Sequence, residues 1–511
     1  MSKLSENNKR IAKNTMFLYF RMLLTMGVAL FTSRVILQAL GVSDFGIYNV
    51  VGGVVAMFGL VKGVMTGASA RFINIALGRD DKPLAKKYFS ISLTIYAGLC
   101  LIFVLLAETI GLWFVNTQLV IPSDRMIAAN WVYQFSILVF INSLLSIPYT
   151  ASIIAHEKMG VYAYVGIIEV VMKLAIVYVL YLFAFDRLIL YGFLLLTSEV
   201  IVRMIYRVHC VRKYDECKYK WYKDWATYKE IITFSSWNIF GVTSSMIKSQ
   251  GLNILLNVFF NPTVNAARGI AYQVNHAILQ FSNNFYMSVR PQVTKYYARN
   301  EIKEMNKLVF RSSKMTLYLM LILSLPVLIE THYILSLWLG QVPDYAVDFV
   351  RYMIVISIIE SMGYPIITAV QATGKIAKYQ IVQGTLTALN IPISYILLKY
   401  FDCQANIVFQ VSFIITTMVA IARVIILSKL ITFPVKEYFY QVFFKGLSVG
   451  VLAAILPFCI HRTLESNIFS VIYTIAVLEI SLMATIYFLG LQKDEKTFIK
   501  GTITNIKKKF K

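Results

Sequence analysis

Basic and amide side chains interrupt two long apolar stretches near the middle of this 511-residue sequence. Lys248 lies about eleven residues from the end of the first stretch, or roughly 16 Å along a helix. In the next stretch Arg268, Tyr272, Asn275 and His276 recur at helical spacing, so they share one helix face. A guanidinium donates forked hydrogen bonds to phosphate oxygens, and an ammonium group adds a point charge. These residue types in this pattern are typical of a site for a phosphate-like anion.

Two further cations, Arg34 and Lys62, lie in apolar stretches near the N-terminus. A charge at the centre of a bilayer costs about 2.5–3.5 kcal/mol on insertion scales, so each needs a partner or water. For Lys62 the simpler alternative is that its ammonium group reaches the nearby membrane surface. We predict an aqueous cationic cavity lined by Arg34, Lys62, Lys248, Arg268, Asn275 and His276. Ion pairing between helices is the structural alternative.

Several acids in the apolar stretches are followed by a base one helical turn later. Glu169 with Lys173, and Glu199 with Arg203, are spaced i to i+4 with the acid first. This order lets each pair neutralise itself on one helix face. We therefore expect these two pairs to be structural.

Glu360 and Glu479 have no base at that spacing, and we regard them as candidates for carrying a coupling ion. The five cysteines are scattered, with no CxxC spacing and no cluster of histidines beside them, so no metal site is expected. The sequence predicts no cofactor. A proton or sodium gradient, or the membrane potential, would supply the energy for transport.

The elements that position these residues must lie in a bilayer. The chain is 58% hydrophobic and only 15% charged, whereas soluble domains carry about 25% charged residues. Many apolar runs reach the roughly 20 residues that a spanning helix needs, and none alternates as barrel strands do. We predict an all-α polytopic membrane protein. Its roughly fourteen spans are expected at 15–38, 46–67, 89–115, 127–150, 161–184, 188–207, 231–259, 267–289, 312–330, 347–371, 379–400, 406–427, 439–460 and 468–490.

Lys and Arg in the connections gather on one side of the predicted membrane. The other side holds only Arg125, Arg187 and Arg462. Because basic connections stay in the cytoplasm, both termini are predicted to be cytoplasmic. The net charge of +23 thus serves orientation and contact with membrane lipids, and it does not indicate a nucleic-acid partner.

An internal similarity divides the chain. Residues 148–158 (PYTASIIAHEK) align with residues 365–375 (PIITAVQATGK), and a repeat about 220 residues long would contain six spans. An even number of spans gives two parallel six-helix lobes, a known transporter plan, followed by two C-terminal helices. The predicted segments are 1–230, 231–430 and 431–511.

Pro148 and Pro365 occupy matching places in the two copies. Proline removes a helix hydrogen bond and bends a span. We predict that they are hinges for the motion of one lobe against the other, with a static bend as the alternative.

Residues 34–48, RVILQALGVSDFGIY, are followed by a Gly-rich second span and by Arg71. This opening, with LG followed by FG-x-Y, resembles that of the Wzx-like polysaccharide flippases. They belong to the multidrug/oligosaccharidyl-lipid/polysaccharide exporter superfamily, which is MATE-like. The resemblance implies alternating access by two lobes around a cationic cavity. It further implies export of undecaprenyl-diphosphate-linked oligosaccharide, such as an O-antigen or capsule repeat, across the bacterial cytoplasmic membrane. Polysaccharide polymerase machinery would be the partner.

Three other classes of function were weighed against this one. A lipid II flippase or a multidrug cation exporter of the same superfamily is the nearest, although the excess of buried cations over lone acids argues against a cation exporter. A membrane enzyme such as a glycan polymerase needs a large outer loop, and the outer connections here are short. No HExxH, GxSxG or Walker loop occurs, so no catalytic site is predicted. A scaffold would not need buried cations on polar helix faces.

Overall fold

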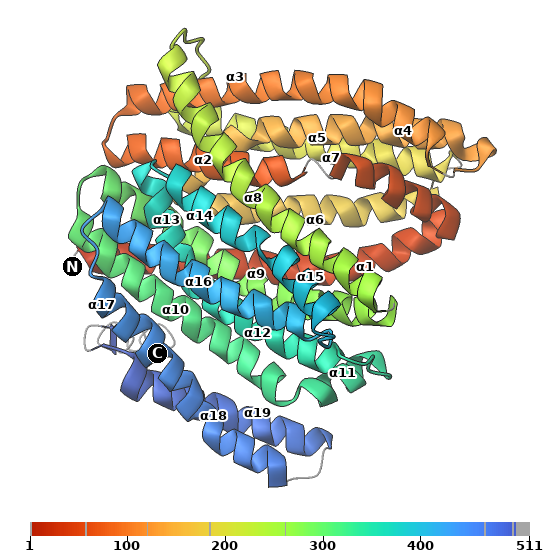
Figure 1. Ribbon diagram of the computed structural model, residues 1–511. Coiled ribbons are helices and arrows are strands. Elements are labelled where there is room, and N and C mark those ends of the chain that lie inside the picture. Colours follow the sequence, from red (N-terminus) through yellow and green to blue (C-terminus); the bar gives the residue numbers. More distant parts are fainter. Residues whose placement is uncertain are drawn as a thin grey trace, which may run out of the picture. The chain divides into compact units, whose positions relative to one another are not determined.

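The computed structural model describes residues 3–56, 59–119, 121–182, 185–260, 262–463, 467–492 and 495–496. These residues are almost entirely helical and contain no β-strand (Figure 1). Ten helical stretches among them are long and apolar enough to cross a membrane. The all-α prediction is confirmed, whereas the number of fourteen spans stays a prediction.

Contacts between residues divide the chain into two compact units. We call residues 10–239 the N-unit, and the other unit, which contains residues 240–511, the C-unit. The division falls inside one continuous helix, α8 (Trp225–Phe259), a few residues beyond the predicted border at 230. The segment 431–511 belongs to the C-unit by the same criterion.

The N-unit is built from seven long or medium helices besides the start of α8. They are α1 (Lys3–Ala56), α2 (Gly59–Gly78), α3 (Lys82–Leu106), α4 (Leu112–Thr117), α5 (Met126–Ala155), α6 (Met159–Leu182) and α7 (Arg187–Lys213). Inside α1, Gly41 has φ +77°, which a side chain would make unfavourable. This kink lies between the first and second predicted spans.

The centre of the N-unit is α5, which packs against α2, α3 and α7. In its most apolar 18-residue stretch, 67% of the residues are buried, a larger share than in the other candidate spans of this unit. Pro148 lies inside α5 without ending it, and the hydroxyl of Ser152 donates to the Pro148 carbonyl at 2.9 Å. The helix thus continues through the proline, and the hinge role of Pro148 stays a prediction.

Arg125 joins three connections at one end of the N-unit. Its Nη2 lies 2.6 Å from Asp44 in α1, and its Nη1 lies 2.5 Å from Asp186. Asp186 also caps α7, because its carboxylate accepts from the backbone N–H groups of Leu188 and Ile189. One of the few basic residues predicted for the outer side is therefore neutralised by two acids.

This arrangement predicts a pH dependence of stability. Burial alone would raise the pKa of Asp186, but hydrogen bonds from Arg125 and the α7 backbone outweigh it and lower that pKa. A lowered folded-state pKa contributes stability above the unfolded value of about 4, and this contribution disappears as pH falls through the folded value. We expect Asp186→Asn, which keeps a capping side chain, to flatten the fall of the unfolding temperature below about pH 4. Thermal unfolding in detergent at several pH values checks this, and identical acid limbs would contradict it.

The C-unit contains the rest of α8 and eleven further helices. They are α9 (Pro262–Ala298), α10 (Ile302–Ile329), α11 (Thr331–Leu339), α12 (Ala346–Met362), α13 (Tyr364–Thr373), α14 (Ala377–Ala388), α15 (Asn390–Tyr400), α16 (Ile407–Leu430), α17 (Val435–Tyr438), α18 (Lys445–Thr463) and α19 (Ile468–Thr485). The stretch α12–α13 packs against α9, α10 and α16, and its apolar window is 72% buried. Pro365 is the second residue of α13, directly after the break at Gly363.

The two C-terminal helices attach to α10 through a small-residue face. A Cβ at Gly446 of α18 would overlap with Leu317, and a Cβ at Gly450 would lie 3.0 Å from Leu321. Small residues at i and i+4 let two helices approach closely in lipid, where burial of apolar surface gives no driving force. The pair α18–α19 is thereby placed on one side of α10 within the C-unit.

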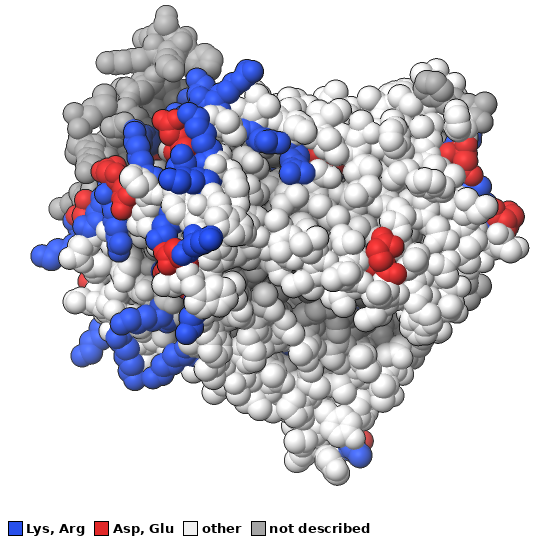
Figure 2. Space-filling view, turned by 90° about the horizontal axis from the view of Figure 1, so that it is seen from above, with Lys and Arg blue, Asp and Glu red and all other residues white. Residues whose placement is uncertain are grey.

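Charged residues are unevenly distributed over the surface that carries α3. In Figure 2, Lys and Arg gather at the end where α3 begins, and most of the remaining face is uncharged. Exposed apolar side chains such as Leu101 and Leu105 occupy the later part of α3. This distribution is that of a helix whose middle faces lipid and whose start faces headgroups and water.

Candidate functional site

The N-unit contains a cavity of about 700 Å³. Five helices supply its walls, namely α1, α2, α5, α6 and α7. The polar and charged lining residues are Thr32, Asn49, Lys62, Ser136, Ser143, Glu169, Lys173, Ser198 and Glu199, with the phenol groups of Tyr48 and Tyr191. A pocket of this size with a few convergent polar groups is typical of a small-molecule site.

The charges in this cavity are mixed. Lys173 lies 2.7 Å from Glu169, which confirms the predicted i, i+4 pair. The predicted pair of Glu199 with Arg203 is wrong, because Arg203 donates to Asn142 of α5 at 2.8 Å. The amide of the neighbouring helix offers Arg203 a better-placed acceptor than the acid on its own helix. Glu199 is left as a cavity-lining carboxylate and is in no ion pair within the described part of the chain.

Residues from the 34–48 motif help to shape this cavity. The ring of Tyr48 meets that of Tyr191 edge to face, with centroids 4.9 Å apart. Such aromatic pairs hold their rings at a defined angle. One turn further along α1, Gly52 and Gly53 line the cavity without filling it. The motif therefore contributes the bend at Gly41, the acid that binds Arg125, and one wall of the cavity.

The predicted site residues fall in both units. Lys62 is exposed and lines the N-unit cavity, and the side chain of Arg34 is outside the described residues. Lys248 is half-buried on α8, and no acid is paired with it in the described chain. That these side chains line one common cationic cavity stays a prediction.

Arg268 is held inside the C-unit by its own surroundings. Its Nη1 donates to Asn253 at 3.0 Å, and its Nη2 donates to the Ser249 carbonyl at 2.6 Å. The guanidinium also lies 4.3 Å from the Tyr272 ring centroid, a favourable cation–π distance. These contacts tie α8 to the first turns of α9. Arg268 is buried, so its first role is to join two helices.

Asn275 and His276 differ in their surroundings. Asn275 is 7% exposed, and its Oδ1 has no hydrogen-bond partner among the described residues. His276 is exposed and shares a hydrogen bond with Gln280, one turn later, at 3.3 Å. A buried amide oxygen without a partner is costly. The Oδ1 of Asn275 can therefore accept a hydrogen bond from a bound group.

The two candidate coupling acids are also unlike each other. Glu360 of α12 lies 3.9 Å from Nη2 of Arg423, a guanidinium that is only 4% exposed. Two other nitrogens of Arg423, Nε and Nη1, have no partner among the described residues. Glu479 of α19 keeps one buried oxygen without a hydrogen bond. Glu360 thus has a base nearby that its helix spacing did not reveal, and a coupling role for either acid stays a prediction.

A second cavity, in the C-unit, is almost entirely apolar. It measures about 500 Å³ and lies among α10, α12, α16 and α18. Its walls include Leu325, Ile358, Phe413, Val451 and Phe458. Such a lining offers no hydrogen bonds and suits a hydrocarbon chain.

Some of these features could not be expected from the sequence. Arg423 and Lys173 were not predicted as site residues, because a base in an apolar stretch does not reveal which helix it meets. The signal that could have identified Glu199 is that it follows Ser198 directly and lies two helical turns after Tyr191 in a largely apolar part of the helix. No group of three His, Cys, Asp or Glu placed to hold a metal occurs in the described residues.

Comparison with known proteins identifies the fold. Residues 242–396 match the MatE family, and no curated protein matches the chain. A multidrug resistance MATE family transporter of the MOP superfamily, in an outward-facing conformation, superposes with TM-score 0.69 at 14% identity, covering 84% of this chain and 99% of that one.

Two further solved structures are similar over most of their length. One is a MOP superfamily transporter from Pyrococcus furiosus, whose reverse polarity of the binding pocket suggests a different function, with TM-score 0.65, 14% identity and coverage of 82% and 96%. The other is the MATE transporter VcmN of Vibrio cholerae, with TM-score 0.62, 15% identity and coverage of 83% and 97%. The chain has the fold of the MATE transporters and is a multi-pass membrane protein.

Proposed function

We propose that this chain exports undecaprenyl-diphosphate-linked oligosaccharides across the bacterial cytoplasmic membrane by alternating access. The observation that carries this proposal is the N-unit cavity, in which two ammonium groups stand among hydroxyl, amide and carboxylate groups. Lys62 would attract the diphosphate as a point charge, whereas the ammonium group of Lys173 is already paired with Glu169. The fold shared with MATE transporters supports transport as the class of activity.

The remaining polar groups of the cavity suit a sugar. Ser136, Ser143 and Asn49 can each donate and accept hydrogen bonds, and the carboxylates of Glu169 and Glu199 accept from sugar hydroxyls. Tyr48 offers an aromatic ring, which packs against the apolar face of a sugar. A site for a simple inorganic anion would not need so many neutral donors and acceptors.

The lipid part of the proposed substrate needs an apolar path. The polyprenyl chain would stay in the hydrocarbon of the bilayer, beside the exposed apolar side chains of the helices. Each buried CH₂ group contributes about 0.8 kcal/mol. A lipid II flippase would use the same diphosphate and polyprenyl chemistry, so it belongs to the same proposal with a different glycan. Polysaccharide polymerase machinery is the proposed partner.

A multidrug cation exporter is the second candidate, and one observation favours it. Glu199 lines the N-unit cavity without an ion-pair partner in the described chain, and a lone carboxylate attracts organic cations. We rank it second because Lys62 lines the same cavity and repels cations, and because the carboxylate of Glu169 is already paired with Lys173. In either case a proton or sodium gradient or the membrane potential would drive transport, with Glu360 and Glu479 as candidate carriers of the ion.

Reconstitution separates the two candidates. Proteoliposomes would receive a labelled lipid-linked oligosaccharide, and access of its glycan to an external lectin would be measured. Loss of one charge-assisted contact, about 1.5–3 kcal/mol, weakens binding roughly 10- to 150-fold. We expect Lys62→Gln to reduce glycan transport by about tenfold at low substrate concentration. Lys158→Gln, an exposed cytoplasmic-loop lysine that does not line the cavity, is the matched control and should transport normally.

Glu199→Gln provides the opposite test. If the chain exports cations, this variant stops the efflux of a cationic dye and leaves lipid-linked glycan untransported, as in the wild type. If the chain exports lipid-linked glycan, neither protein moves the dye. Dye transport by the wild type without glycan transport would reject the proposed function.

A further inference from the structure

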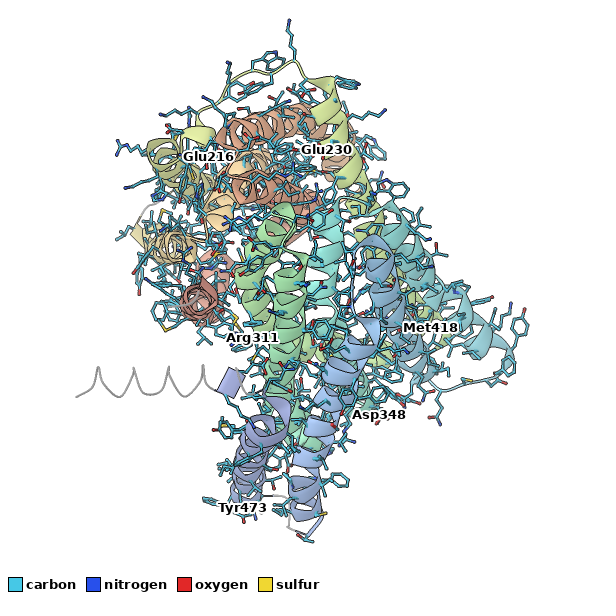
Figure 3. All side chains as sticks on the ribbon, turned by 90° about the vertical axis from the view of Figure 1, so that its left-hand side faces the viewer. Glu216, Glu230, Arg311, Asp348, Met418 and Tyr473 are labelled. Carbon is cyan, nitrogen blue, oxygen red and sulfur yellow. The ribbon has the colours of Figure 1, made fainter. Side chains whose placement is uncertain are left out.

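Residues 214–224, which connect α7 to α8, form an extended strap that lies along the start of α3. It contains only a short 3₁₀ turn, Asp215–Cys217, before α8 begins at Trp225. In Figure 3, the strap passes over the helices of the N-unit between Glu216, in its 3₁₀ turn, and Glu230, in α8. All of its contacts discussed below are within the N-unit.

Three contacts fix the strap to one face of α3. Asp224 is ion-paired with Lys87, the backbone N–H of Lys220 donates to the Ser90 hydroxyl at 3.1 Å, and the hydroxyl of Tyr219 lies 3.2 Å from that of Thr94. Positions 87, 90 and 94 share one helix face. The strap therefore runs antiparallel to α3, from the middle of the helix towards its start.

Two aromatic rings of the strap, and the ring of Trp225 at the start of α8, are largely uncovered. Tyr219 is 50% exposed, Trp221 is 58% exposed and Trp225 is 73% exposed. Large rings with one polar atom are favoured at the level of lipid headgroups, where one end is apolar and the other is wet. These rings are therefore expected to be in contact with something other than water.

The position of the strap along α3 agrees with that level. Leu101 is the first strongly exposed leucine of α3, at 69%, and it follows Thr94 by about two turns, or roughly 10 Å. The headgroup layer on each side of a bilayer is about 5–8 Å thick. Since Tyr219 reaches Thr94, its ring lies close to the boundary between headgroups and hydrocarbon.

The lysines around the strap exceed the acids that could neutralise them. Asp215 is ion-paired with Lys218 at 2.6 Å, and Asp224 is ion-paired with Lys87. Four further lysines have no acidic partner among the described residues; they are Lys82, Lys86, Lys220 and Lys223. All lie on the strap or on the first two turns of α3. In Figure 2 this end of the face carries most of the Lys and Arg that are visible.

We propose that the strap and the start of α3 form a binding site for anionic phospholipid headgroups, with Tyr219, Trp221 and Trp225 inserted at the interface and the four unpaired lysines facing the phosphates. An acidic cytoplasmic protein would be attracted by the same lysines, but it would not need aromatic rings so near to the exposed leucines of α3. The strap would then hold the start of α8 against the membrane surface.

The test uses the full chain reconstituted in phosphatidylcholine vesicles that contain spin-labelled phosphatidylglycerol or spin-labelled phosphatidylcholine. The immobilised fraction of each label gives the selectivity for the anionic lipid. We expect the selectivity of the wild type to fall at least twofold in a variant with Lys82, Lys86, Lys220 and Lys223 changed to Gln, and to fall with added salt.

A matched control variant loses the same number of charges elsewhere, with Lys303, Lys375, Lys378 and Lys436 changed to Gln; all four are exposed in the C-unit. It should keep the selectivity. Equal selectivity in wild type and strap variant, or an equal loss in the control, would overturn the proposal. A second readout needs no lysine change. Brominated lipid should quench the emission that Trp221→Phe removes, and an unquenched Trp221 would also overturn it.

Discussion

Replacing Lys314 by methionine is expected to destabilise the C-unit by about 3–5 kcal/mol, the usual cost of removing one member of a buried ion pair. The Lys314 ammonium lies 2.9 Å from Glu495, and the two side chains are only 2% and 6% exposed. The same carboxylate accepts from the backbone N–H of Gln492 at 2.8 Å. This pair therefore connects α10 to the residues that follow α19. Thermal unfolding in detergent would measure the loss, with release of the C-terminal residues detected by limited proteolysis.

A double variant tests the reason for that loss. Lys314→Met leaves the Glu495 carboxylate buried without a counter-charge, whereas Lys314→Met with Glu495→Gln leaves no buried charge and keeps an acceptor for Gln492. We expect the double variant to recover most of the lost stability. The exposed pair of Lys307 with Glu304, also at 2.9 Å, is the matched control, and Lys307→Met should cost less than about 1 kcal/mol. A double variant as unstable as the single one would show that charge burial is not the cause.

Arg268→Met is expected to destabilise the protein by about 2–4 kcal/mol, because it removes several hydrogen bonds to a charged group in a buried place. The side-chain amide of Asn253, and both the carbonyl and the hydroxyl of Ser249, would lose the donor that Arg268 now provides. The end of α8 and the first turns of α9 then lose their polar connection. The measurement is the unfolding temperature together with the yield of monodisperse protein after extraction.

Lys248→Met is the matched control on the neighbouring helix, since Lys248 is half-buried and pairs with no acid in the described chain. We expect it to unfold at the wild-type temperature, and a loss of glycan transport in this variant would support the separate prediction that Lys248 faces the substrate. This contrast divides the predicted cationic residues into one that joins helices and one that is available to a substrate. If Arg268→Met is as stable as the wild type, its three contacts do not hold α8 to α9.

Much of the fold could be predicted from local features. A run of apolar residues must be helical in a bilayer, because no water is there to satisfy its backbone. The helices at 126–155, 159–182 and 407–430 accordingly lie close to predicted spans. The pair of Glu169 with Lys173 was predictable for a related reason, since partners one turn apart meet whatever surrounds the helix.

The places where helices break were harder to predict from the sequence. The long α1 combines the first predicted span with part of the second, and its direction changes at Gly41. The predicted single span at 347–371 is two helices that meet at Gly363, where a Cβ would lie 2.7 Å from Nη1 of Arg423. A glycine in an apolar run indicates that a close approach is tolerated, but it does not say which side chain approaches.

The sequence by itself determined that this chain is a bundle of membrane helices and where most of those helices run. These properties depend on composition and on helical spacing, which act within about 20 residues. Only the tertiary structure decided that Arg203 binds Asn142 and leaves Glu199 to the cavity, that Arg268 joins α8 to α9, and that Lys314 finds its acid near the end of the chain. The physical reason is that the rotation and approach of packed helices select a partner for each buried charge, and neither is encoded in the spacing of one helix.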